Sequence, residues 1–302
     1  MDKDEVRSNL TGPLSSIMTP FTQDGSIDED GLRTYIDRSI EGGSRSMILT
    51  AGDSQYFCLS DQEIAEVTRI TVDHTAGRAM VISADRYYGT ERAIEFARYS
   101  KEIGVDLYMA LPPTWGGCTA EDLAQHFVEL GAIMPVMVVT AMFTGKSDAF
   151  ALETLRIMLD RSDRVMAIKD DRGVPFAQQM GMECHDRCAI FAGGTKLLHL
   201  GMVPFGVDGY MSMYQSFNSE ITDRYWQAVR SGDFKTASQI CHQYDVALLD
   251  HLTTYDGGWN VAAHGLLEVY GIAERWKRKP YTSLDPAGME RLRDFLKGLG
   301  VL

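Results

Sequence analysis

The amino-acid sequence is poor in cysteine, and its cysteines form no framework pattern. There are five in 302 residues, namely Cys58, Cys118, Cys184, Cys188 and Cys241. Cys184 and Cys188 are the single close pair, and nothing elsewhere in the chain completes a zinc site around them. An odd and scattered set is typical of free thiols in a reducing compartment. We therefore expect a cytoplasmic protein that holds no structural metal.

Long apolar runs and an excess of basic residues are also missing. No run approaches the roughly 20 residues that a membrane span needs, and the first seven residues are charged, unlike a secretory signal. The 29 basic residues are outnumbered by 42 acidic ones, a formal net charge of -13. This charge favours solubility and argues against nucleic acid as the main partner. It does not exclude a small anionic substrate, because one local cation can outweigh the global field.

Short apolar segments alternate with helical patterns along most of the chain. Eight strands alternating with helices at this spacing predict an α/β fold, a (β/α)8 or TIM barrel with right-handed crossovers. A doubly wound open sheet is the alternative, because periodicity cannot show closure. The predicted strands are 15–21, 45–51, 79–84, 106–111, 135–140, 165–171, 189–194 and 209–213, and helices are predicted at 29–41, from a capping box at 60–63, and at 93–103, 120–130 and 150–161.

After the eighth strand the pattern becomes purely helical. Helices are predicted at 219–230, 233–252, 260–270 and 286–299. This is more than one barrel helix requires. We therefore divide the chain into a barrel, 1–218, and a C-terminal helical region packed on it, 219–302.

One predicted strand, Val165 to Asp171, ends abruptly in a lysine and two aspartates. Its apolar residues lie on both faces, which suits a parallel strand covered by other structure. Burying an ammonium at the end of such a strand is costly, so burial favours the neutral amine. A neutral lysine can attack a carbonyl and form a Schiff base. The plain alternative is that Lys169 reaches solvent beside its two acids.

The barrel prediction gives these polar residues a common location. In a TIM barrel the active site lies at the C-terminal ends of the strands. Asp53, Asp85, Lys169, Asp170 and Asp171 all lie at or just beyond such ends. This favours Lys169 as a catalytic residue. The carboxylates of Asp53, Asp85 and Asp171 could alternatively hold Mg²⁺, although solvated rim acids are the simpler interpretation.

Several motifs follow one another in a characteristic order: Met18-Thr19-Pro20-Phe21 with Asp24-Gly25-Ser26-Ile27-Asp28, Leu59-Ser60 with Glu63, Thr90-Glu91-Arg92-Ala93-Ile94, Gln125-His126-Phe127 and Ala167-Ile168-Lys169-Asp170. Their order resembles the dihydrodipicolinate synthase and N-acetylneuraminate lyase family from about Leu10 to Leu299. The resemblance implies a TIM barrel with a C-terminal helical region, assembled as a homotetramer or dimer. It also implies that Lys169 forms a Schiff base with a 2-oxo acid, commonly pyruvate, without a metal or organic cofactor.

The loop after the second strand departs from this family. The family reads Gly-Thr/Ser-Thr-Gly-Glu there and holds the substrate carboxylate with hydroxyls and N–H groups, whereas this chain reads Ala51-Gly52-Asp53-Ser54-Gln55. An ionised Asp53 would repel a carboxylate. Gly52, Asp53 and Ser54 are still the predicted substrate contacts, with Asp53 turned away and Ser54 and local N–H groups binding.

The fifth strand departs as well. Val139 stands where the family has a tyrosine that relays protons, and valine cannot transfer a proton. No tyrosine occurs between Tyr108 and Tyr210, so a small alignment slip cannot restore it. Losing a positioned acid–base group typically costs about 10²–10⁴-fold in rate. The family's best-known reaction is therefore not expected. Substitute proton carriers could be Tyr56, Tyr87, Tyr88, Asp53, Asp85 or a water molecule.

Three further positions complete the predicted site. Thr144 stands where the synthase branch has an arginine for a second carboxylate, with Lys146 nearby. Trp115 follows the fourth strand, where the family's residue reaches a neighbouring active site, and Gly209 resembles the family's backbone position near the substrate. We include Val139, Trp115 and Gly209 among the substrate-binding residues.

Three functions fit these features. The first is a Schiff-base lyase, synthase or dehydratase acting through Lys169 on a 2-oxo acid or a sugar-acid derivative. The second is a barrel that has lost the chemistry and serves as a binding or structural protein, because the carboxylate loop, the tyrosine and the arginine are all replaced. The third is a metal-assisted enzyme using the rim aspartates.

Overall fold

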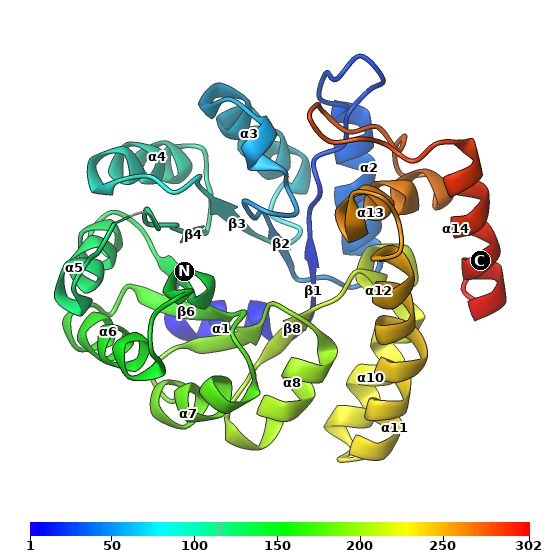
Figure 1. Ribbon diagram of the computed structural model, residues 1–302. Helices are drawn as coiled ribbons and strands as arrows, with labels where there is room; N and C mark the ends of the chain where they lie inside the picture. Colours follow the sequence, from blue (N-terminus) through cyan, green and yellow to red (C-terminus); the bar gives the residue numbers. More distant parts are fainter. Residues whose placement is uncertain (115) are drawn as a thin grey trace.

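Eight parallel strands close into a barrel surrounded by helices (Figure 1). The computed structural model describes residues 1–114 and 116–302. Each strand pairs with the next, and β8 pairs with β1 to close the ring. The predicted TIM barrel is confirmed, and the open-sheet alternative is wrong. The strands are β1 (Gly12–Ser16), β2 (Ser46–Ile48), β3 (Met80–Ala84), β4 (Leu107–Met109), β5 (Val136–Val139), β6 (Val165–Asp170), β7 (Ala189–Ala192) and β8 (Gly209–Met211).

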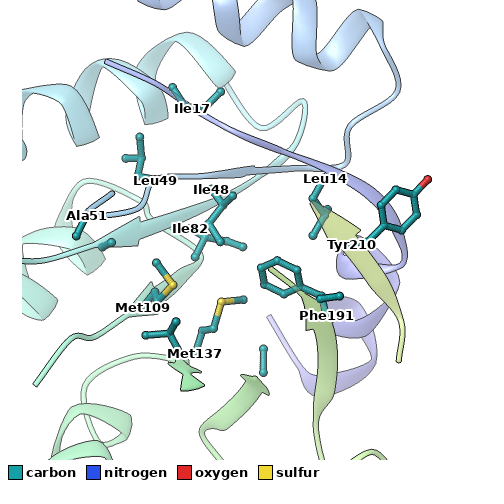
Figure 2. Packing of buried hydrophobic residues seen from close by; sticks show 14 of the residues in the cluster. Leu14, Ile17, Ile48, Leu49, Ala51, Ile82, Met109, Met137, Phe191 and Tyr210 are labelled. Atoms are coloured by element: carbon teal, nitrogen blue, oxygen red, sulfur yellow. The ribbon is translucent and has the colours of Figure 1, made fainter. Parts of the chain in front are cut away.

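The strands are short and covered on both faces. Every residue of β3, β5 and β6 is buried, as expected for parallel strands between outer helices and an inner core. Figure 2 shows Ile48, Ile82, Met109, Met137 and Phe191 meeting inside the barrel. Their side chains fill the interior, so the barrel is a packed core and not a channel.

The helices that alternate with the strands begin at capping residues that the sequence marks. Asp28 accepts a hydrogen bond from the N–H of Gly31 at 2.9 Å, and Ser60 and Glu63 form the predicted capping box. Each such cap stabilises a helix by about 1 kcal/mol. These helices are α2 (Glu29–Glu41), α3 (Asp61–Thr75), α4 (Thr90–Glu102), α5 (Ala120–Gly131), α6 (Asp148–Arg161), α7 (Val174–Cys184) and α8 (Lys196–Met202), with short 3-10 turns η1 (Tyr56–Cys58), η2 (Thr140–Phe143) and η3 (Val203–Phe205).

The N-terminal helix α1 (Lys3–Leu10) is absent from the sequence-based prediction. It packs on β6 and β7 through the buried side chains of Val6 and Leu10. Arg7 donates to Asp208 at 2.9 Å and so ties the helix to the start of β8. The rest of the helix is polar, so its apolar face is too narrow to give a periodic signal.

The chain after β8 is helical and lies along one side of the barrel (Figure 1, yellow to red). The predicted helices 219–230 and 286–299 are confirmed, whereas 233–252 is interrupted by a π-helical segment, η4, that turns Asp245 toward the buried Lys196 at 3.0 Å. Within the described ranges, no helix has both the length and the apolar character that a bilayer crossing needs. The elements are α9 (Tyr214–Phe217), α10 (Ser219–Arg230), α11 (Phe234–Ile240), η4 (Cys241–Val246), α12 (Ala247–Leu252), α13 (Gly258–Val269) and α14 (Pro286–Leu299).

Gly209 begins β8 at the N-terminal end of the barrel, where it pairs with Gly12 of β1. A Cβ at position 209 would overlap the carbonyl oxygens of Leu10 and Gly12. Glycine is needed here because another backbone approaches closely. The prediction that Gly209 contacts the substrate is therefore wrong, since active sites lie at the opposite, C-terminal ends of the strands.

Replacing Gly209 by alanine should destabilise the protein. The added methyl group would force the backbones of β1 and β8 apart, which should lower the free energy of unfolding by about 1–3 kcal/mol or more. Gly298→Ala is the matched control, because a Cβ in that part of α14 meets nothing within 4 Å and alanine favours helix by up to about 1 kcal/mol. Urea unfolding followed by circular dichroism measures both, and equal midpoints for the two variants would contradict the expectation.

Candidate active site

Lys169 lies inside the barrel at the C-terminal end of β6. It pairs in register with Val139 on β5 and with Phe191 on β7, and Phe191 points into the barrel interior (Figure 2). Ala167, which shares Lys169's face of the strand, pairs with Met137, another interior residue. Only 6% of Lys169 is exposed. The alternative of a lysine that reaches solvent is therefore wrong.

The amine of Lys169 is paired with Asp171. Nζ donates to both carboxylate oxygens of Asp171 at 2.5 Å, and 21% of the Asp171 side chain is exposed. Both partners of the ion pair pack against Gly193, where a Cβ would overlap Nζ of Lys169 and Oδ1 of Asp171. Glycine at the end of β7 thus leaves the space that the ion pair occupies.

Thr140, the first residue of η2, fixes the chain just beyond Lys169. Its hydroxyl donates to Oδ1 of Asp170 at 2.6 Å and accepts from the N–H of Asp171 at 2.9 Å. Asp170 is fully buried, and burial raises its pKa despite the bond from Thr140. Asp170 faces away from Lys169 because strand side chains alternate. It therefore supports the strand end and does not face the barrel interior.

A cavity of about 220 Å³ opens at this end of the barrel. Its walls come from the ends of β1, the β2 loop, β7 and β8, and from α2 and the C-terminal helices α12 and α13. Gly193 belongs to these walls, so the cavity adjoins the amine of Lys169. The lining residues are Ser16, Met18, Tyr35, Asp53, Gly193, Gly194, Met211, Ser212, Met213, Leu249 and Trp259.

Asp53 lines this cavity and is not turned away as the sequence analysis expects. Burial raises the pKa of its carboxyl group above the ordinary 3.8. The charge of Lys169 acts in the opposite direction, and the charge of Asp171 adds to the increase. Asp53 is therefore electrostatically coupled to the ion pair on β6.

Ser54 does not take the predicted substrate-binding role. Its hydroxyl is fully buried, donates to the carbonyl of Ile17 at 2.5 Å and accepts from the N–H of Thr50 at 3.1 Å. The N–H groups of residues 53–56 also donate within the loop. Gly52 lies exposed at the rim. The β2 loop uses its polar groups to hold its own shape, which leaves Asp53 as its residue on the cavity wall.

The remaining predicted site positions are Val139, Trp115 and Thr144. Val139 is 3% exposed and pairs directly with Lys169, so the position beside the lysine carries no proton-transferring group. Trp115 lies outside the described residues. Thr144 is exposed, and its hydroxyl donates to the carbonyl of Ala141 at 2.7 Å.

The predicted tyrosines do not reach the cavity. Tyr56 is fully buried, Tyr88 donates to Asp61 at 2.6 Å, and Tyr87 stacks on Phe57. Tyr35, which is absent from the sequence-based prediction, lines the cavity instead, and its hydroxyl donates to the carbonyl of Ser16 at 3.0 Å. Tyr35 lies in the middle of α2, and no local sequence pattern indicates that such a residue reaches the cavity.

Two cavity-lining hydroxyls were also missed. The hydroxyls of Ser16 and Ser212 are buried and have no hydrogen-bond partner in the described part of the chain. Buried polar groups are normally satisfied, so both are available to a polar group of a bound molecule. Both residues lie at the C-terminal ends of strands, β1 and β8, where the active site of a TIM barrel is expected. Their sequence positions could therefore have indicated them.

Asp85 does not belong to a group of rim carboxylates. It is fully buried, accepts from the hydroxyl of Tyr108, and accepts from the N–H of Leu111 at 2.9 Å. Tyr108 packs on Phe96 of α4, which places this pair in the layer between strands and helices. Among residues 1–114 and 116–302, no three His, Cys, Asp or Glu side chains form a group that could hold a metal ion. The predicted trio of Asp53, Asp85 and Asp171 is therefore not assembled.

The buried carboxyl of Asp85 should make stability depend on pH. Burial raises its pKa from 3.8 to about 7, so the folded protein binds this proton more tightly than the unfolded chain. The resulting stabilisation is complete below pH 3.8 and is lost as the pH rises through about 7. Between pH 5 and 8 the free energy of unfolding should fall by on the order of 3 kcal/mol relative to Asp85→Asn. Chemical denaturation at both pH values tests this, and a parallel change in both proteins would contradict it.

Comparison with known proteins identifies the family. The model of the dihydrodipicolinate synthetase family matches residues 9–299. The chain belongs to this family. It is 28% identical over 297 residues to 4-hydroxy-tetrahydrodipicolinate synthase of Halorhodospira halophila, a match that covers 96% of this chain and 97% of that protein. Family membership makes the chain one of the class I lyases and aldolases.

Solved structures of low sequence identity share the fold. N-acetylneuraminate lyase from Fusobacterium nucleatum gives a TM-score of 0.86 at 19% identity, covering 96% of this chain and 99% of that one. YagE, a prophage protein of the dihydrodipicolinic acid synthase family from E. coli K12 in complex with pyruvate, gives 0.83 at 20% identity, covering 97% and 99%. The relatives are named for different reactions, so the family does not identify the reaction of this chain.

Proposed function

We propose that this protein is a Schiff-base lyase that acts on a 2-oxo acid, such as pyruvate or a sugar-acid derivative, through Lys169. The observation that carries the proposal is the position of Lys169: a buried amine at the catalytic end of a closed barrel, beside a cavity. Pyruvate in the YagE structure supports the choice of substrate class. A homo-oligomer is part of the same proposal by family resemblance.

The chemistry requires the neutral amine. Nζ attacks the carbonyl carbon of the 2-oxo acid, and loss of water leaves an iminium ion that withdraws electrons from the neighbouring carbon. Asp171 holds the amine with two hydrogen bonds and can accept its proton as the carbonyl compound enters. Since Asp171 is partly exposed, its carboxylate can also rehydrate when the pair separates.

The cavity limits the substrate. None of its lining residues in the described part of the chain is basic, and Met18, Met211, Met213, Leu249 and Trp259 give it apolar walls. A second carboxylate would therefore find no cation, while Asp53 would repel it. We propose a substrate with a single carboxylate, whose remaining part is uncharged.

The second candidate is a barrel that binds ligands without catalysis. Val139 beside Lys169 is the specific observation that favours it, because that position cannot carry a proton. In such a protein Lys169 and Asp171 would remain a structural ion pair. Covalent trapping separates the two candidates, since only a reactive amine forms an imine.

Borohydride reduction in the presence of pyruvate or another 2-oxo acid should leave a mass adduct on Lys169. Lys169→Arg should abolish the adduct, because a guanidinium cannot form the imine. Lys277→Arg is the matched control: Lys277 is also buried and desolvation lowers its pKa to about 8, but it binds Asn260 and does not line the cavity. Peptide mass spectrometry locates the adduct. An adduct that survives in Lys169→Arg, or none with any 2-oxo acid, would contradict the proposal.

A further inference from the structure

The proposed reaction needs a group that moves protons at the carbon next to the iminium. Conversion of the iminium to the reactive enamine removes a proton from that carbon, and the enamine carbon then takes up a proton or forms a bond to an electrophile. The position beside Lys169 on β5 is occupied by Val139, which cannot do this. The carrier must therefore come from another wall of the cavity.

Hydrogen bonding and position exclude most other titratable groups nearby. Asp85 is enclosed with Tyr108 behind the strands, and Asp170 is held by Thr140 on the opposite face of β6. Asp171 already faces the nitrogen of Lys169 and not the neighbouring carbon. The hydroxyl of Tyr35 donates to the carbonyl of Ser16, and burial raises its pKa.

Asp53 is the carboxylic acid on the cavity wall itself. It approaches from the β2 loop, across the ring from β6, so a molecule bound to Lys169 in the cavity would lie between the two residues. Hydrogen bonds that involve Thr50, Ser54 and Ile17 hold the loop in this position. A carboxyl fixed opposite the nucleophile and partly removed from water is the arrangement that general acid–base catalysis uses.

We infer that Asp53 carries the proton in this enzyme, in place of the family's tyrosine; the inference rests on the proposed Schiff-base function. The ionised carboxylate takes a proton from the carbon beside the iminium. The electron pair of that C–H bond becomes the C=C bond of the enamine, and the C=N electrons return to the nitrogen of Lys169. The protonated Asp53 then returns the proton to the carbon, so no other reactant is consumed.

The surroundings of Asp53 tune its proton affinity. Lys169 and Asp171 face it from β6 with opposite charges, the Ser16 hydroxyl lies beside it on β1, and Tyr35 lies near it on α2. Burial raises the pKa of Asp53 above 3.8, which makes it a better base near neutral pH than an exposed aspartate. The rate of hydrogen–deuterium exchange at the substrate carbon should therefore rise with pH as Asp53 ionises, and we call this rise the pH limb of Asp53.

The test separates imine formation from proton transfer. Pyruvate in D₂O should lose its methyl proton NMR signal when the enzyme is added, because the proton held by Asp53 exchanges with the solvent and the enamine then receives deuterium. In Asp53→Asn the exchange rate should fall by about 10²–10⁴-fold and lose its pH limb, while borohydride still traps pyruvate on Lys169. Asp53→Glu should restore part of the exchange. Asp186→Asn, an exposed carboxylate at the other end of the barrel, is the control and should exchange like the parent protein.

Each outcome has one meaning. If Asp53→Asn and the smaller Asp53→Ser both trap pyruvate and exchange within about threefold of the parent protein, Asp53 is not the carrier. Using two substitutions prevents a folding defect in one of them from deciding the result. If the parent protein itself forms no adduct on Lys169, the Schiff-base function is wrong and the role of Asp53 is overturned with it.

Discussion

The ion pair between Lys169 and Asp171 is the interaction on which the site depends. An unpaired ammonium at a position that is 6% exposed would cost several kcal/mol in lost hydration. Asp171 offsets that cost from the loop side, Gly193 leaves the space for it, and Thr140 sets the direction of the chain between them. The same partner holds the amine beside Gly193, which lines the cavity. The contact that makes the burial of Lys169 tolerable is therefore also the one on which its proposed reactivity depends.

The C-terminal helices complete the cavity that the barrel begins. Leu249 of α12 and Trp259 of α13 close its outer side. Gln55, two residues after Asp53, donates to Asn260 of α13 at 2.8 Å and contacts His264 at 3.0 Å. Burial lowers the pKa of His264 to about 3, so its ring stays neutral near pH 7. This polar contact fixes the β2 loop against α13, and with it the place of Asp53.

Much of the fold follows from sequence patterns, because periodicity and capping are local. The helix of residues 29–41 and the capping box at Ser60 were both predictable for this reason, and Lys169 was found because charge interrupts an apolar strand. The predictions of site residues were wrong where a contact with a distant part of the chain determines the role of the residue. Ser54 lies in the predicted loop, but its hydroxyl donates its hydrogen bond to the carbonyl of Ile17. Gly209 is explained by the backbones of α1 and β1. Tyr35 and Trp259 reach the cavity from helices whose packing no local pattern describes.

The family supplies the fold, while the residues around Lys169 set the reaction that we propose for this chain. Val139, Asp53 and the apolar cavity walls all differ from a site built for two carboxylates and a tyrosine relay. A crystal soaked with pyruvate is the most direct measurement of the central claim. Continuous density from Nζ of Lys169 to the second carbon of pyruvate, with Asp171 released from the amine, is the expected result. An intact Lys169–Asp171 pair with pyruvate absent from the cavity, or bound there without a bond, would contradict it.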